Sequence, residues 1–213
     1  MYWFHYVGKA LTRIALLVLA SWHVNGKENV PRQGPLLVVA NHLNLADPPI
    51  ISTSLGRKAI FMAKQELFHS LPGYFVRSFG AFPVRRGGFD RRALEEAQAW
   101  LGKGVAVVMF PEGSRSLTAR LQPAFPGSAL IASRVGVPIL PVGITGTEKI
   151  KGSSWWLRRP KITVNIGRPF NLPPADGRTR KEELSQYTES IMKHIAELLP
   201  AEYRAEPENQ HEN

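Results

Sequence analysis

The chain has 213 residues, 44% of them hydrophobic, which is the size and composition of one globular domain with a substantial apolar core. It contains no cysteine, so disulfides, thiol catalysis and cysteine-bound metals are excluded. Lys and Arg number 27 against 17 Asp and Glu, and this net charge of +10 favours an anionic partner: a nucleic acid, an anionic membrane or a phosphorylated substrate.

The N-terminal segment, residues 1–23, has the pattern of an amphipathic helix. A basic stripe, His5, Lys9 and Arg13, repeats every four residues, and the apolar residues gather on the opposite side: Trp3, Phe4, Val7, Leu11, Ile14, Val18 and Trp22. A spanning helix would carry Lys9 and Arg13 into hydrocarbon, whereas an interfacial helix leaves them among the headgroups. We therefore expect an interfacial membrane helix; the alternative is a helix packed on the domain's own core.

Alternating strand and helix patterns follow this segment. In chain order they are a strand at 36–40, a helix at 48–55, a strand at 59–64, an extended run at 81–86, a helix at 91–102, a strand at 105–110, a helix at 127–135, strands at 137–144 and 161–167, and a helix at 180–199. This alternation predicts the α/β class: a single layered domain, residues 24–200, with a mainly parallel or mixed central sheet flanked by helices. The polar residues 201–213 carry four Glu and one Arg, which predicts a disordered acidic tail.

The stretch NHLNLADPP, residues 41–49, separates His42 from Asp47 by five positions. In a continuous helix or strand the two side chains would point apart. Pro48 fits the first position of a helix, however, which makes Asp47 its N-cap and places a bend after His42. The Asp47 carboxylate can then hold one imidazole nitrogen and leave the other free to accept a proton. The alternative is that Asp47 only caps the helix and His42 is a loop residue.

A second stretch, VMFPEGSRS at residues 108–116, runs a strand directly into Pro-Glu-Gly. Gly113 allows close approach of the backbone, and the serines and arginine that follow present hydrogen-bond donors. The pattern is typical of a cradle for an oxyanion or a phosphate. The alternative is a tight turn closed by an ion pair between Glu112 and Arg115.

A third stretch, GAFPVRRG at residues 80–87, carries two arginines at the end of an extended run. The two-residue period of extended chain sends Arg85 and Arg86 to opposite sides. One of them can therefore face a site while the other faces solvent. The alternative is an ordinary solvated basic loop.

Four blocks in this order, NHLNLAD, GAFPVRR, FPEGSRS and VPILPV, resemble the glycerolipid acyltransferase family. The resemblance covers roughly residues 30–170, and the best-known members acylate 1-acyl-sn-glycerol-3-phosphate to make phosphatidic acid. It implies that His42 is the general base and that Asp47 orients it. It also implies that a further set of residues holds the glycerol-phosphate of the acceptor: Lys64, Arg86, Glu112, Gly113 and Arg115.

Two positions depart from the family pattern. Arg85 stands where the family often has an acidic residue, so either Arg85 or Arg86 could face the phosphate. Pro126 replaces a basic residue that is common before Gly127. Neither departure removes the chemistry that the resemblance implies.

The implied reaction transfers an acyl group from coenzyme A or acyl carrier protein to the free hydroxyl of lysophosphatidic acid, at the cytoplasmic face of an anionic membrane. The acyl thioester is a co-substrate, and the resemblance implies no metal and no other cofactor. The alternatives are an acyltransferase with another acceptor, such as glycerol-3-phosphate or another lysolipid, and a membrane- or lipid-binding protein without catalysis. Nucleic-acid binding is not expected, because the sequence has no RNP, zinc-finger or helix-turn-helix signature.

Overall fold

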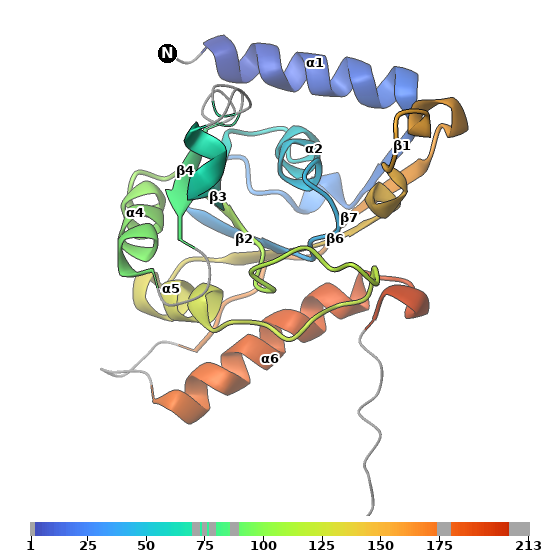
Figure 1. Cartoon of the computed structure of the whole chain (residues 1–213). Coiled ribbons are helices and arrows are strands. Elements are labelled where there is room, and N and C mark those ends of the chain that lie inside the picture. The colour runs from blue at the N-terminus through green and yellow to red at the C-terminus, as the bar shows by residue number, and fades with distance from the viewer. Residues whose placement is uncertain are drawn as a thin grey trace, which may run out of the picture.

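A computed structural model gives the fold and describes residues 3–69, 73, 76, 80–85, 90–173 and 180–204 (Figure 1). Its strands are β1 (Ser21–Asn25), β2 (Leu36–Ala40), β3 (Ala59–Lys64), β4 (Ala81–Val84), β5 (Ala106–Met109), β6 (Ile139–Thr145) and β7 (Lys161–Ile166). Its helices are α1 (Trp3–Leu19), α2 (Asp47–Ser54), α4 (Arg91–Gly102), α5 (Gly127–Val135) and α6 (Lys181–Glu197). Short 3-10 turns are η1 (Lys27–Asn29), η2 (Gln65–His69), η3 (Thr147–Lys149), η4 (Trp155–Arg158) and η5 (Ala201–Tyr203).

The strands form one seven-stranded sheet in the order β1-β7-β6-β2-β5-β3-β4. From β6 to β4 all neighbouring strands are parallel, while β7 pairs antiparallel with β6 and β1 runs parallel to β7. The sheet is therefore mixed and mainly parallel, which confirms the predicted α/β class. The carboxyl ends of β2, β5, β3 and β4 lie at one edge, so the loops that follow these strands can build a common site.

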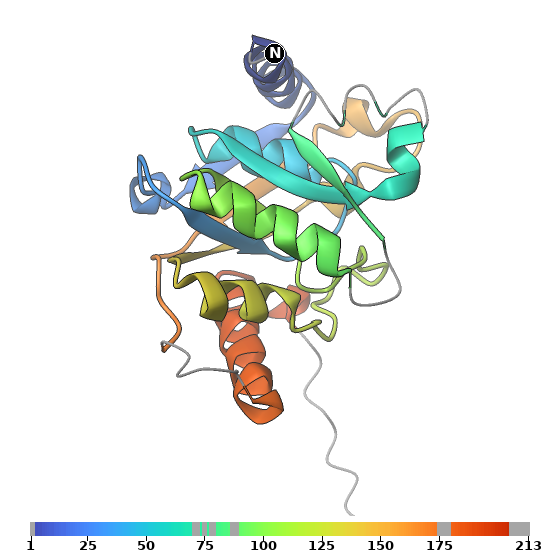
Figure 2. The ribbon, with the colours of Figure 1, turned by 90° about the vertical axis from the view of Figure 1, so that its left-hand side faces the viewer.

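Helices cover both faces of the sheet (Figures 1 and 2). Along β2, Leu36, Val38 and Ala40 join an apolar cluster with α1 and α2, whereas Leu37 and Val39 join a second cluster with α4, α5 and α6. Every residue of β2 is buried, because successive side chains alternate between two covered faces. The two clusters hold β2, and with it the start of the following loop, at the centre of the domain.

The N-terminal helix ends earlier than predicted. The helix stops at Leu19, and residues 21–25 form β1, which pairs in register with β7 from Ser21 to Asn25. The predicted boundary between residues 23 and 24 therefore falls within a strand. The open edge of β7 offers hydrogen bonds that extended residues such as Trp22 and Val24 can take, and local helical periodicity does not reveal that edge.

The apolar side of α1 faces away from the domain, so the alternative of a helix whose apolar side packs on the domain's core is wrong, and Lys9 of the basic stripe does not face outward as predicted. Lys9 points toward the domain, where its Nζ donates a 2.6 Å hydrogen bond to the carbonyl of Arg57, and burial lowers the pKa of Lys9 to about 8. Leu16 and Ala20 are buried on the same side. The exposed side is apolar and consists of Val7, Leu11, Ile14, Leu17 and Val18, each 40–61% exposed. Among the described residues, no helix is both long enough and apolar enough to cross a bilayer.

Part of the predicted acidic tail is ordered. Residues 201–203 form η5. The hydroxyl of Tyr203 donates to Glu148 Oε1 at 2.8 Å, and the main-chain carbonyl of Tyr203 accepts from the amide of Leu121 at 2.9 Å. Burial raises the pKa of Tyr203 to about 12. The prediction of disorder is therefore wrong for residues 201–204, because a single aromatic residue reaches distant partners; residues 205–213 lie outside the described residues.

Candidate active site

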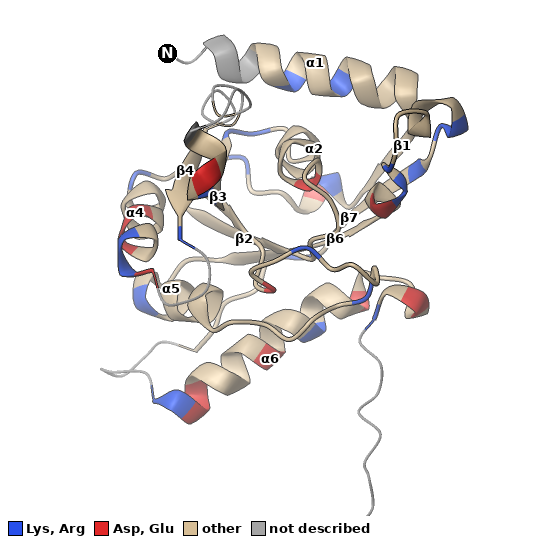
Figure 3. Ribbon diagram, viewed as in Figure 1, with Lys and Arg blue, Asp and Glu red and all other residues tan. Residues whose placement is uncertain are grey.

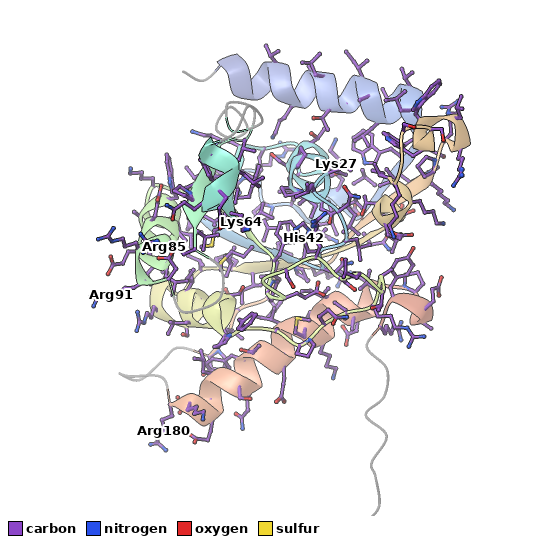
Figure 4. All side chains as sticks on the ribbon, in the orientation of Figure 1. Lys27, His42, Lys64, Arg85, Arg91 and Arg180 are labelled. Atoms are coloured by element: carbon purple, nitrogen blue, oxygen red, sulfur yellow. The ribbon has the colours of Figure 1, made fainter. Side chains whose placement is uncertain are left out.

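The residues singled out in the sequence gather at the carboxyl edge of the parallel strands. His42 follows β2, Lys64 is the last residue of β3, Arg85 follows β4, and the loop that contains Glu112 follows β5. Figure 4 shows His42 near the centre of the molecule, with Lys64 and Arg85 toward the side of α4. Four separate stretches of chain are thus brought to the carboxyl edge of the sheet, which is where open α/β sheets bind their ligands.

His42 and Asp47 form a buried pair. The imidazole Nδ1 lies 2.8 Å from Asp47 Oδ2, and the residues are 4% and 0% exposed. A carboxylate can only accept, so the proton of this hydrogen bond sits on Nδ1 and the lone pair sits on Nε2. The predicted contact between His42 and Asp47 is confirmed. It gives the histidine the tautomer that a general base needs.

Asp47 reaches back toward the loop instead of capping the helix. It is the first residue of α2, with Ala46 at the N-cap position, and its Oδ2 accepts the amides of Leu43 at 2.6 Å and Asn44 at 2.7 Å. The interpretation of Asp47 as the N-cap is therefore wrong. Pro48 and Pro49 have no amide hydrogen, so the first turn offers few donors to its carboxylate. The carboxylate instead folds the loop around the imidazole.

The loop after β5 holds the main chain of His42 from both sides. The amide of His42 donates to Glu112 Oε1 at 2.8 Å, and its carbonyl accepts from the amide of Ser116 at 2.8 Å. The imidazole also stacks on the ring of Phe110, with ring centroids 4.2 Å apart. The position of the histidine is thus fixed by its ring, its amide and its carbonyl together.

The side chain of Glu112 points into the protein and is not exposed to a ligand. Its side chain is buried, and its second oxygen, Oε2, accepts the amide of Gln122 at 2.9 Å. Burial raises the pKa of Glu112 to about 7 despite the two amide donors. The alternative of an ion pair between Glu112 and Arg115 is wrong, because the carboxylate points inward while Arg115 is exposed.

The loop from Glu112 to Ser116 turns sharply at Gly113. Gly113 has φ 67°, and a Cβ at this position would lie 2.9 Å from the ring of Phe125. Only glycine fits both constraints without strain. The turn leaves Arg115 exposed between Glu112 and Ser116, the two residues that bond the main chain of His42, so its guanidinium is accessible to a ligand at this edge.

Two further basic residues at the edge are described. Lys64 is partly exposed, with its Nζ 3.4 Å from Glu66 Oε1, and Arg85 Nε donates to Gln65 Oε1 at 3.2 Å. Arg86 lies outside the described residues, so the choice between Arg85 and Arg86 stays open. Within the described parts of the chain, His, Asp and Glu form no group of three that could hold a metal ion.

Asn41 is a site residue that sequence reasoning missed. Its Nδ2 donates to the carbonyl of Ile144 at 2.9 Å and its Oδ1 accepts the amide of Ile144 at 2.8 Å, so the side chain pairs with β6 as a strand would. Asn44 makes a second link, from Nδ2 to the carbonyl of Ile150 at 3.3 Å. An amide side chain beside His42 was visible in the sequence, but its partner lies 103 positions away.

The comparisons with known proteins agree with this geometry. Residues 21–145, more than half of the chain, match the family model described as Acyltransferase. The 1-acyl-sn-glycerol-3-phosphate acyltransferase of Streptococcus pneumoniae is 33% identical over 167 residues, which cover 74% of this chain and 61% of that protein. The chloroplastic enzyme of the same name from Brassica napus is 32% identical over 181 residues, covering 81% and 52%. The chain thus spans between half and two thirds of the length of these curated relatives.

A solved structure extends the likeness beyond the matched segment. The crystal structure of the 1-acyl-sn-glycerophosphate acyltransferase of Thermotoga maritima superposes with a TM-score of 0.68 at 30% sequence identity. The superposition covers 92% of this chain and 80% of that one. The fold, the family match and the paired His42 and Asp47 agree, and the chain therefore belongs to the acyltransferase family.

Proposed function

We propose that the chain transfers an acyl group from an acyl thioester to the free hydroxyl of 1-acyl-sn-glycerol-3-phosphate and so makes phosphatidic acid. The observation that carries the proposal is the 2.8 Å contact between His42 Nδ1 and Asp47 Oδ2, which leaves Nε2 free to accept a proton. The relatives from Streptococcus pneumoniae and Brassica napus, whose names state this activity, support the choice of acceptor.

His42 acts as the general base. Nε2 removes the proton of the acceptor hydroxyl while the oxygen attacks the thioester carbonyl; the C–S bond then breaks and the thiolate takes the proton back from the imidazolium. General-base assistance of this kind contributes roughly 10²–10⁴-fold in rate. Asp47 stabilises the imidazolium that forms, and because it accepts three hydrogen bonds in place it needs no rearrangement to do so.

The cations at the same edge bind the acceptor's phosphate. Arg115 is exposed after the Gly113 turn, and Lys64 and Arg85 extend the positive charge toward β4. Arg86, which follows Arg85 in the sequence, is the other candidate for the phosphate contact. A guanidinium offers a planar, two-pronged donor that matches a phosphate. Binding the phosphate at a fixed distance from His42 converts a collision into an oriented encounter. In this assignment Glu112 positions His42 and does not touch the phosphate.

The outward apolar side of α1 supports association with a membrane. Val7, Leu11, Ile14 and Val18 share that side, and a helix with an unpartnered apolar side fits the plane of the bilayer interface. The proposed location is the cytoplasmic face, where the acyl thioesters of coenzyme A and acyl carrier protein are available. Lys9, in this arrangement, holds the helix to the domain and does not contact headgroups.

The test is mass spectrometry of the lipids formed by the purified protein from a panel of acceptors and acyl donors. We expect phosphatidic acid from lysophosphatidic acid, and no product from the same mixture with His42→Ala. Faster acylation of glycerol-3-phosphate or of a lyso-aminolipid would identify another acceptor. Lipid binding without any acylated product would identify a binding protein and contradict the proposal.

A further inference from the structure

The turn η4, between β6 and β7, presents apolar side chains to solvent. Trp156 is 47% exposed and Leu157 is 66% exposed. The indole Nε1 of Trp156 donates to the carbonyl of Ser153, just before the turn, at 3.0 Å, so the one polar atom of this side chain has a local partner. The exposed part of the ring is therefore purely apolar. Exposure of Trp156 and Leu157 to water is unfavourable, whereas both side chains are favoured at a membrane interface.

This turn is fastened to the end of α1. The guanidinium of Arg159 donates from Nη2 to the carbonyl of Leu17 at 3.1 Å, and the amide of Ser21 donates to the carbonyl of Pro160 at 3.0 Å. Figures 1 and 2 both place the orange turn beside α1, on the side of the sheet that faces away from α6. The turn that carries Trp156 and Leu157 therefore lies beside the C-terminal end of α1, whose exposed side is apolar. We call these two residues and that side of α1 the docking surface.

Basic residues lie in both parts of the chain that form the docking surface (Figure 3). Residues 149–161, which contain η4, include no acidic residue and several exposed basic ones: Lys149, Lys151, Arg158, Arg159 and Lys161. Residues 3–19 of α1 also lack acidic residues and carry the exposed Arg13. An apolar patch bordered by cations matches the acyl chains and the negative headgroups of an anionic bilayer.

The same connection also contacts the catalytic loop. Just before it, at the end of β6, Ile144 is paired with Asn41, and within it the carbonyl of Ile150 accepts from Asn44 at 3.3 Å. At its far end, Arg159 is bonded to α1. A stretch of fewer than twenty residues thus joins the loop that holds His42 to the docking surface.

We propose that η4 is a second membrane-contacting element, which docks the domain together with α1 on an anionic bilayer and holds the edge that carries His42 next to the lipid surface. The last part of this statement rests on the proposed function, because it gives the bilayer the role of substrate source. The contact of η4 with lipid does not depend on catalysis and is tested separately.

The first test uses fluorescent labels. Because the chain has no cysteine, single cysteines at Leu157→Cys, Leu11→Cys and Ser185→Cys can each carry an environment-sensitive dye. Vesicles of phosphatidylcholine with phosphatidylglycerol should shift the emission of the dye at positions 11 and 157 to shorter wavelength. The dye at 185, exposed on α6 across the sheet, should not respond. A shift at 11 without one at 157 would overturn the proposal and leave docking by α1 intact.

The second test measures co-sedimentation with vesicles. Trp156→Ser combined with Leu157→Ser should weaken binding several-fold. Arg158→Gln should lower partitioning onto anionic vesicles about fivefold and leave binding to pure phosphatidylcholine unchanged, since one basic residue near an anionic surface contributes that much. Lys193→Gln, an exposed charge on α6, is the matched control and should change neither. Equal losses for Arg158→Gln and Lys193→Gln would contradict a specific surface.

Turnover separates this proposal from the proposed function. The variant at Trp156 and Leu157 should lose activity on lysophosphatidic acid in vesicles and keep it on the same lipid dispersed in detergent. If the unaltered protein acylates nothing in detergent, the proposed function fails while the dye and sedimentation results still decide the contact. If the variant is equally active in vesicles and in detergent, η4 does not present the site to the bilayer.

Discussion

The main-chain amide of His42 donates to the buried carboxylate of Glu112 at 2.8 Å, and so joins two motifs that lie 70 residues apart. Two carboxylates therefore serve one histidine: Asp47 orients the ring, and Glu112 fixes the backbone that carries it. This relationship gives the glutamate of the FPEGSRS block a positioning role. In the proposed function, the exposed cations of the same edge bind the phosphate.

Replacing His42 tests the assigned base. His42→Ala should lower turnover at least about 100-fold, since general-base catalysis is removed. It should also lower the free energy of unfolding, because the ring is buried and stacked on Phe110. Asp47→Asn should lose less, since an amide oxygen can still accept from Nδ1. Steady-state rates and urea unfolding separate the two effects; a folded His42→Ala protein with near-normal turnover would refute the mechanism.

Glu112 predicts a specific dependence of stability on pH. Its pKa is raised from an ordinary 4.5 to about 7, so the folded state holds a proton that the unfolded state releases between these values. The stability that Glu112 contributes is therefore complete below pH 4.5 and declines as pH rises to about 7, by an amount on the order of 3 kcal/mol. Urea unfolding of the natural protein and of Glu112→Gln at several pH values measures this loss of stability.

The comparison with Glu112→Gln cancels the other titrating groups. Glutamine keeps one acceptor and turns an NH₂ group toward the second amide, which costs about 1–3 kcal/mol at every pH. The advantage of the natural protein over the variant should therefore shrink from pH 4.5 to pH 7 and then stay constant. A difference that does not change with pH would show that the carboxyl titrates normally.

Asn41 should control turnover without contacting substrate. Asn41→Ala leaves the amide and carbonyl of Ile144 without their partner, which should cost about 1–3 kcal/mol of stability and lower kcat more than it raises KM. Asn25→Ala, which removes an exposed amide contact to Asn165, is the matched control and should change the stability by less than about 0.5 kcal/mol. Equal effects of the two variants would exclude a positioning role for Asn41.

Arg115 should affect binding of the phosphorylated acceptor and not binding of the acyl donor. Arg115→Ala should raise KM for lysophosphatidic acid at least about tenfold, with little change in KM for the acyl thioester. Arg115→Lys should recover only part of the lost acceptor affinity, since lysine lacks the two-pronged geometry. Arg134→Ala, on α5, serves as the control for loss of charge. Applying the same assay to Arg85→Ala and Arg86→Ala identifies which of the two faces the phosphate.

Much of this architecture could be predicted from local patterns. Residues 36–40 are five consecutive apolar residues and residues 127–135 have helical spacing, and both elements occur with the predicted bounds. The contact between His42 and Asp47 was also predictable, because both residues lie in one short loop. The partners of Asn41, Glu112 and Tyr203 were not, since each lies tens of residues away and is selected only by the assembled sheet.

The orientation of α1 shows the same limit. Hydrophobic periodicity separates an apolar side from the side of Lys9, but it does not state which side meets the domain. The hydrogen bond from Lys9 to the carbonyl of Arg57, 48 residues further along the chain, turns the side of Lys9 toward the domain. Truncation should therefore end at residue 19, because removing residues 1–23 would also cut β1.

Only Ala20 separates α1 from β1, and its amide still donates to the carbonyl of Leu16, so the helix passes into the edge strand without a flexible joint. The domain is consequently not suspended from its helix by a tether. In the docking proposed above, α1 lies flat on the bilayer; this sets the tilt and roll of the whole sheet, and every docked molecule presents His42 at the same height and in the same direction. Adsorption and alignment become one event, and no rotational search separates arrival at the membrane from access to its lipids.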